Sequence, residues 1–141
     1  MYVDKELIFE MGWDLGAVAT ATTDFSDGCI NLGSTGRDVG AGRQMYAVIA
    51  VTETFVPSST VGTVYFSLIE DANDTISAGS VVLLTTEAFV TTVLTEGRAA
   101  IAIPVPSSVA LQYLGISCTF SNDLDDGIVD AFLALEVQTN A

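Results

Sequence analysis

Apolar and polar residues alternate with a period of two in several parts of the chain, which is typical of β-strands that bury one face. The alternation is clearest in residues 112–120 and 128–137 and recurs in residues 63–69 and 99–105. The predicted buried faces are Leu114, Ile116, Cys118 and Phe120; Val129, Ala131, Leu133, Leu135 and Val137; Val64, Phe66 and Leu68; and Ala99, Ile101, Ile103 and Val105.

Shorter apolar runs predict four more strands, because Val, Ile, Thr and aromatic residues recur between Gly, Asp, Asn, Ser and Pro. These runs are residues 17–23, 28–32, 46–51 and 81–84. Residues 46–51 are apolar on both faces, which favours a central strand. Pro104 and Pro106 end the strand at 99–105 or place it at a sheet edge. The turn residues 121–127 predict that the last two strands are consecutive and antiparallel.

Eight short antiparallel strands fit an all-β, two-sheet sandwich or a barrel, and a jelly roll is our prediction. The periodicity alone also allows an immunoglobulin-like sandwich. Residues 1–16 differ from the rest because they mix charges with large apolar side chains. We therefore expect an N-terminal arm over residues 1–16 and one β-sandwich domain over residues 17–141.

The charge of the chain narrows the range of partners. The 141 residues include 18 acids against four bases, which gives a net charge of −14. The four bases are Lys5, Arg37, Arg43 and Arg98. Such a surface repels nucleic-acid phosphate and anionic membranes, so neither is expected as a partner. We therefore expect apolar contact, backbone pairing or a few local charges to hold whatever the chain binds.

Histidine is absent from the sequence. Histidine is the commonest general base near neutral pH and the commonest metal ligand, so its absence removes much of enzyme chemistry. A nucleophile–His–Asp site cannot be built from these residues. We therefore expect a protein that is not an enzyme and that needs no cofactor.

The cysteines and the N-terminus indicate the cellular compartment in which the chain is synthesised. Cys29 and Cys118 lie far apart in sequence, and two free thiols are expected in a reducing compartment, although a disulfide stays open. The first ten residues carry acids where a signal peptide has a basic region. Synthesis in a cytosol is the prediction.

Two acidic turns are candidate sites. Asp123, Asp125 and Asp126 precede Gly127 and could hold a hard cation such as calcium, but no acid follows at the closing position of a calcium loop. A solvated hairpin turn is the favoured interpretation, so no metal is expected. Residues 70–74 are a second acidic turn, for which a solvated loop is favoured over paired catalytic carboxylates.

Two other segments are candidates for contact with a partner. Residues 33–43 contain four glycines, but no helix follows as a phosphate-binding loop requires. Here Arg37 and Arg43 could pair with acids of a neighbouring subunit or within the chain. In the N-terminal segment, the apolar side chains could anchor a partner or cap the sandwich's own core. The predicted contact residues are Leu7, Phe9, Trp13, Arg37 and Arg43.

Several short motifs make the sequence similar to the capsid cement proteins of tailed bacteriophages. The motifs are Asp4-Lys5-Glu6-Leu7-Ile8-Phe9, Ala17-Val18-Ala19-Thr20-Ala21, Ile30-Asn31-Leu32-Gly33, Arg37-Asp38-Val39-Gly40-Ala41-Gly42, the strand from Tyr46, and Ala110-Leu111-Gln112-Tyr113-Leu114. The likeness covers most of the chain. Two regions depart from the family's pattern: the segment at residues 11–16 looks longer than in the family, and the turn at residues 123–126 is unusually acidic.

The resemblance implies a jelly-roll subunit that assembles as a homotrimer on the outer surface of a virion. The trimer would bridge neighbouring major capsid proteins and stabilise the shell as a decoration protein. The alternative is a carbohydrate-binding β-sandwich module of a phage or other surface structure. Such a module usually presents exposed Trp or Tyr beside loop carboxylates, whereas this chain has one Trp and four Tyr.

Overall fold

The computed structural model describes residues 7–18, 20, 22–33, 37–38, 44–106 and 108–135. Across these residues the fold is all-β, with two short 3₁₀ turns, η2 (Leu15–Ala17) and η3 (Thr91–Val93), and no α-helix. The strands are β1 (Ile8–Asp14), β2 (Thr23–Phe25), β3 (Ile30–Asn31), β4 (Arg37–Asp38), β5 (Tyr46–Pro57), β6 (Thr63–Asp71), β7 (Val81–Thr85), β8 (Phe89–Val90), β9 (Ile101–Pro104), β10 (Ser108–Val109), β11 (Tyr113–Phe120) and β12 (Leu124–Ala134).

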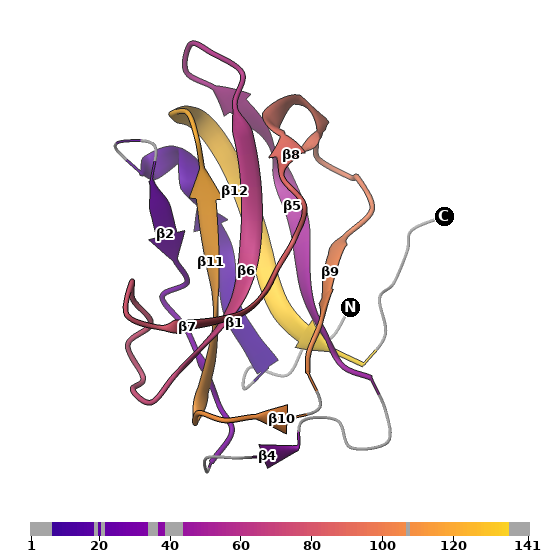
Figure 1. Ribbon diagram of the computed structural model, residues 1–141. Helices are drawn as coiled ribbons and strands as arrows, with labels where there is room; N and C mark the ends of the chain where they lie inside the picture. Colours follow the sequence, from indigo (N-terminus) through magenta and orange to yellow (C-terminus); the bar gives the residue numbers. More distant parts are fainter. Residues whose placement is uncertain are drawn as a thin grey trace.

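The strands form two antiparallel sheets (Figure 1). One has four strands in the order β1-β12-β5-β9. The other has six, with β11 and β6 at its centre, β2 and β3 along β11, and β7 and β8 along β6. The last two strands are consecutive as predicted, but the expected antiparallel pairing between them is wrong, because β11 and β12 belong to different sheets. A separate two-residue pairing joins β4 to β10.

One hydrophobic core lies between the two sheets. Ile49 and Val129 enter it from the four-stranded sheet, and Phe66 and Ile116 enter it from the six-stranded sheet. All four side chains are completely buried. Burying one such side chain stabilises the fold by about 1.5–3 kcal/mol, so this core is the main source of stability. The predicted inward faces of residues 63–69 and 114–120 are confirmed.

The predicted number of strands is wrong, because the two sheets contain ten strands among the described residues rather than eight. The additional strands are β1 and β8. Of the strand expected at residues 17–23, Ala17 instead ends η2, and β2 begins only at Thr23. The last strand starts earlier than expected, at Leu124, inside the segment assigned to the turn.

The N-terminal residues that the structure describes do not form a separate arm. Residues 8–14 are the edge strand β1, which pairs with β12 from Ile8 opposite Phe132 to Asp14 opposite Ile128. The carboxylate of Asp14 then accepts the Ala17 N–H over 3.2 Å and caps η2. The proposed boundary after residue 16 therefore does not divide two structural units. No helix among the described residues has the length and apolar character needed to cross a membrane.

Candidate interaction surfaces

One side of the sandwich is closed by contacts between β1 and the segment from β2 to β3. The indole Nε1 of Trp13 donates to Oδ2 of Asp24 over 2.8 Å. The backbone N–H of Asp27 donates to Oε2 of Glu10 over 2.9 Å. At Gly28 the backbone lies so close to the Phe9 carbonyl that a Cβ would be 2.1 Å from its oxygen. This close approach requires glycine.

Burial raises the pKa of the Glu10 carboxyl at this closed edge. The hydrogen bond from the Asp27 N–H opposes the rise, while the negative charges of Asp27 and Asp24 add to it. The edge is thus joined by directed hydrogen bonds in spite of three neighbouring carboxylates. These bonds hold the two sheets together on this side.

The structure places the predicted N-terminal contact residues in or against the core. Phe9 is 1% exposed and Trp13 is 3% exposed, so neither ring is presented to a partner by this subunit. Their prediction as contact residues is therefore corrected to the core-capping alternative. Leu7 is half-buried and packs against the same core. In contrast, Met11 between them is exposed.

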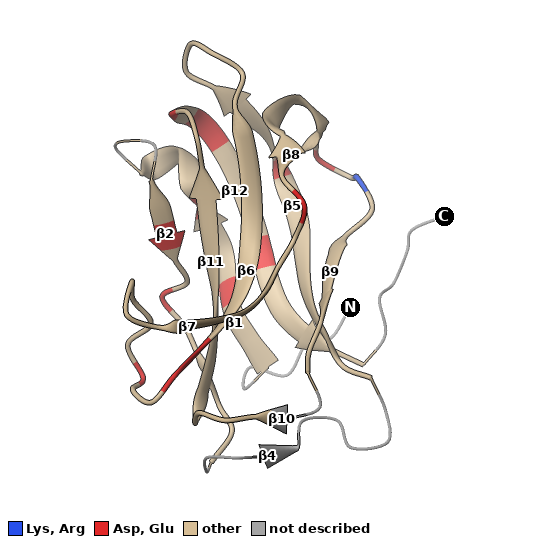
Figure 2. Ribbon diagram, in the orientation of Figure 1, with Lys and Arg blue, Asp and Glu red and all other residues tan. Residues whose placement is uncertain are grey.

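Of the two arginines in the glycine-rich segment, only Arg37 lies within the described residues. Arg37 lies in β4, where its backbone pairs with Val109 of β10. Arg43 lies outside the described residues, so its predicted contact stays a prediction. A third cation, Arg98, which was not among the predicted contact residues, lies between η3 and β9 (Figure 2).

The acidic turn after β11 has its oxygens engaged with nearby protein groups. The backbone carbonyl of Asp123 accepts the Ser58 N–H over 3.0 Å, and the Asp125 carboxylate accepts the Ser58 hydroxyl over 2.7 Å. The carboxylate of Asp126 accepts the Gly127 N–H over 2.9 Å. Among the described residues no group of three or more His, Cys, Asp or Glu side chains is arranged to hold a metal ion.

Acidic side chains from β1, β5 and β12 gather near Glu53. Repulsion by Asp126 is the largest of the causes that raise the pKa of Glu53, and Asp14 and Glu96 add to it. This group of carboxylates makes one end of the four-stranded sheet strongly negative. It disfavours contact of that end with another acidic surface.

The second acidic turn differs from its prediction at Glu70. Its side chain is 5% exposed, and Oε2 accepts the N–H groups of Ala110 and Leu111 over 3.0 and 3.1 Å. Glu70 thus holds the chain in place where it leads into β11. Asp71, next along the chain, accepts the Ser80 hydroxyl over 2.6 Å, and this bond lowers the pKa of the Asp71 carboxyl. The prediction of a solvated loop is wrong for Glu70.

The two cysteines are free thiols. Cys118 is completely buried in the core, and burial raises the pKa of its thiol well above the ordinary value. Cys29 is half-buried and donates to the Asp74 carbonyl over 3.3 Å. Burial and the nearby Asp74 carboxylate raise the pKa of Cys29 as well. The expectation of two free thiols is confirmed.

A shallow groove of about 300 Å³ lies on the outer face of the six-stranded sheet. Hydroxyl groups dominate its lining and pair across the strands: Thr23 with Thr119 over 2.8 Å, and Ser67 with Thr85 over 3.0 Å. The rings of Phe25 and Tyr65 also line it. No charged side chain is among the described residues that line this groove, so it is a polar but uncharged surface.

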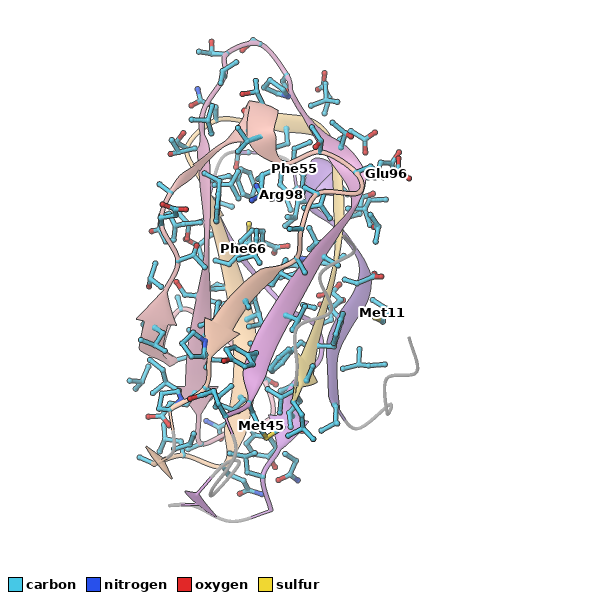
Figure 3. The ribbon with its side chains drawn as sticks, turned by 90° about the vertical axis from the view of Figure 1, so that its right-hand side faces the viewer. Met11, Met45, Phe55, Phe66, Glu96 and Arg98 are labelled. Atoms are coloured by element: carbon cyan, nitrogen blue, oxygen red, sulfur yellow. The ribbon has the colours of Figure 1, made fainter. Side chains whose placement is uncertain are left out.

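The side of the sandwich opposite the closed edge is open. There β8 lies at the edge of one sheet and β9 at the edge of the other, and a groove of about 450 Å³ is lined by residues that include Glu87, Phe89, Arg98 and Ile101. Figure 3 views the molecule from this side and shows Arg98 near one end of it. The described residues have nine exposed large apolar side chains, and five of these belong to β7, β8 and η3: Val81, Val82, Leu84, Val90 and Val93.

A model of the Bbp16 family matches residues 15–133 of the chain. The match covers most of both sheets, from η2 to β12. The protein therefore belongs to the Bbp16 family. A search of curated proteins found no match to this sequence.

Proposed function

We propose that this protein is a structural capsid cement, or decoration, protein of a tailed bacteriophage. It binds the outer surface of the capsid as a homotrimer and stabilises the shell by bridging neighbouring major capsid proteins. The proposal includes a jelly-roll connection of the sandwich strands and synthesis in the host cytoplasm before attachment to the virion. The protein acts by binding and catalyses no reaction.

The observation that carries this proposal is the concentration of exposed apolar side chains on a rigid and strongly acidic sandwich. Monomeric soluble proteins rarely expose large continuous apolar patches, and such patches usually mark contacts between proteins. Here β7 alone exposes Val81, Val82 and Leu84. The absence of histidine supports the same conclusion, because the chain lacks the usual general base.

The mechanism follows from mass action. A ligand that binds the closed shell and not its separated subunits stabilises the closed shell. Linking three copies adds effective concentration, so weak contacts to several capsid subunits sum to firm attachment. The closed edge at Trp13 and Asp24 keeps the subunit rigid, which avoids an ordering cost on binding.

A reconstitution experiment tests the proposal. Particles of the encoding phage that lack this protein are mixed with the purified chain, and bound protein is measured after sedimentation. Saturable binding and a higher temperature of DNA release are the expected results. Absence of binding to intact particles contradicts the proposal. Serum albumin at equal concentration controls for nonspecific stabilisation.

A second candidate function is favoured by the groove on the six-stranded sheet. Its hydroxyl groups and the rings of Phe25 and Tyr65 are a combination that can bind a sugar. Under this alternative the protein is a carbohydrate-binding module of a phage or other surface structure. A glycan array with calcium present tests it: a signal lost in Tyr65→Ala supports sugar binding, and an array without signal counts against it.

A further inference from the structure

We infer that the free edge of β7 accepts an extended segment of the major capsid protein as an additional strand, and that this segment is uncharged at its centre and basic at its ends. The inference rests on the proposed function, because it names the surface and the kind of capsid segment through which the cement protein binds. It assigns no role to the groove beside Arg98.

The backbone of β7 has an edge that no strand covers. Within the described residues β7 pairs with β6 only. Such an edge presents unpaired N–H and C=O groups, which can bind an extended chain by adding it as a strand. Natural proteins usually protect edge strands with charged residues or proline. Residues 75–86, which include β7, contain neither.

The other outer strands of the two sheets, as far as the structure describes them, are protected or short. The pairing of β1, which bears Glu10 and Asp14, has two register shifts, and β9 ends in Pro104. Strand β2 has three residues with Asp24 at its centre, and β3 and β8 have two residues each. Strand β7 is therefore the outer strand best suited to accept a partner strand.

Side chains on both faces of β7 are available to such a partner. Val82 is 57% exposed, Val81 is 50% exposed, and Leu84 is exposed as well. Val82 and Thr85 also line the uncharged groove on the outer face of the six-stranded sheet. A strand added beside β7 would cover the exposed valines, and removal of apolar area from water is favourable. Apolar contact and backbone pairing then stabilise the same complex.

Carboxylates stand at both ends of this uncharged strand (Figure 2). Ser80, immediately before β7, donates its hydroxyl to the Asp71 carboxylate over 2.6 Å. Glu87 follows the last residue of β7 by two positions and is exposed. A segment that complements this edge is therefore uncharged where it meets β7 and basic where it passes Asp71 and Glu87.

The same carboxylates disfavour a second copy of this chain as the occupant. In an antiparallel pair of two β7 strands, Asp71 of each copy meets Glu87 of the other, and in a parallel pair each acid meets its own counterpart. Like charges placed opposite each other destabilise strand pairing. The net charge of −14 on each chain adds to the repulsion. The occupant is thus a different protein, and under the proposed function it is the major capsid protein.

Val82 is a position at which the outer edge can be changed without loss of a hydrogen bond to β6. The Thr86 N–H donates to the Phe66 carbonyl over 2.9 Å. Strand β6 pairs with β11 without a register shift, so every second residue after Phe66, including Glu70, directs its backbone toward β7. Val81 lies opposite Glu70, so the N–H of the next residue, Val82, points away from β6.

Binding of the full chain to capsids that lack it, measured by sedimentation of the particles, tests the inference. Val82→Pro removes the outward N–H, and Val82→Lys places a charge on the edge while keeping this donor. Both variants should raise the dissociation constant at least about tenfold. Val61→Pro and Val61→Lys make the same changes in the β5–β6 loop, where Val61 is 50% exposed, and should bind like the unmodified chain. Circular dichroism melting verifies the fold of each variant, and Val82→Lys tests the edge if Val82→Pro does not fold.

Charge reversal tests the basic ends of the partner segment. Glu87→Lys should weaken capsid binding at low salt, and added salt should reduce the difference from the unmodified chain. Glu96→Lys makes the same change of charge at an exposed residue between η3 and β9 and should bind like the unmodified chain. Equal effects of the two charge reversals overturn the inference.

Val82 variants that bind capsids like the unmodified chain overturn the inference and leave the cement function intact. Val61 variants that lose as much binding as the Val82 variants also overturn it. Sedimentation velocity of the free chains identifies a second copy as the occupant if the Val82 variants lose self-association, and this result overturns the inference as well. An unmodified chain that does not bind capsids contradicts the cement function and the inference with it.

Discussion

The indole Nε1 of Trp13 donates a hydrogen bond of 2.8 Å to Oδ2 of Asp24, and this bond joins the edge strands of the two sheets. Trp13 belongs to β1 of the four-stranded sheet, and Asp24 belongs to β2 of the six-stranded sheet. The indole is buried and its acceptor is a carboxylate. At this edge the two sheets are therefore joined by a buried hydrogen bond rather than by a strand that crosses between them.

Loss of this bond should destabilise the fold. Trp13→Phe removes the donor but keeps an aromatic ring, and a hydrogen bond to a charged group contributes about 1.5–3 kcal/mol. We expect the free energy of unfolding in urea, followed by circular dichroism, to fall by about that amount. Asp24→Ala and the double variant complete a thermodynamic cycle. Strictly additive effects of the two substitutions would show that the bond contributes nothing.

Glu70 supports the second prediction. Glu70→Ala removes the carboxylate that accepts the N–H groups of Ala110 and Leu111, and the loss of a hydrogen bond to a charged group costs about 1.5–3 kcal/mol. Glu70→Gln keeps one oxygen acceptor and should cost less. The matched control is Glu87→Ala, which removes an exposed carboxylate and should leave the unfolding midpoint nearly unchanged. Equal effects of the substitutions at Glu70 and Glu87 contradict the assigned role.

The acidic group around Glu53 predicts a pH-dependent stability. The pKa of Glu53 is raised in the folded protein, first by Asp126, so protonation of this carboxyl favours the folded state. That stabilisation is present at pH values below the ordinary glutamate pKa of 4.5, and it is lost as the pH rises through the pKa of Glu53 in the folded protein. Glu53→Gln should therefore raise the melting temperature at pH 7 and have little effect near pH 3. Added salt should reduce the gain at pH 7.

Glu87→Gln makes the same chemical change at an exposed site outside this acidic group. Its melting temperature at pH 7 should stay close to that of the unmodified chain. If Glu53→Gln raises the melting temperature equally at pH 3 and pH 7, charge repulsion is not the cause of the gain, and the assignment is contradicted.

The thiols provide a fourth prediction. Only the thiolate reacts with disulfide reagents, and both cysteines have raised pKa values. In the native protein Cys29 should react slowly at pH 7 and faster as the pH rises, whereas Cys118 should react only after unfolding. A colorimetric thiol assay should count one native and two denatured thiols. Cys29→Ser should abolish the reaction of the native protein. A rapid reaction that persists in the native Cys29→Ser variant contradicts the assignment of the reactive thiol to Cys29.

Alternation in the sequence predicted the strands that lie at the centres of the sheets. Phe66 and Leu68 of β6, and Ile116 and Cys118 of β11, are buried where a period of two places them. These strands pair over long regular stretches, so local pattern and burial agree. The same alternation places Glu70 on the inward face of β6. This pattern could have predicted that Glu70 is buried, although a carboxylate is expected to face solvent.

The edge strands were harder to predict because their geometry is irregular. In β1 the register shifts between Glu10 and Trp13, around Gly12 at a φ of 66°. The shift exposes Met11, which strict alternation from Phe9 places inside. Strand β8 has two residues, too few to alternate. The contact of Phe9 and Trp13 with their own core depends on long-range pairing of β1 with β12, which local sequence does not encode.

The central claim is that the protein stabilises a phage shell by binding, and heating of reconstituted particles tests it most directly. Capsids of the encoding phage that lack this chain are incubated with increasing amounts of it, and DNA release is followed with an intercalating dye during heating. The account predicts saturable binding and a release temperature that rises with occupancy until the sites are filled. Release at the same temperature from bare and fully decorated particles would contradict it.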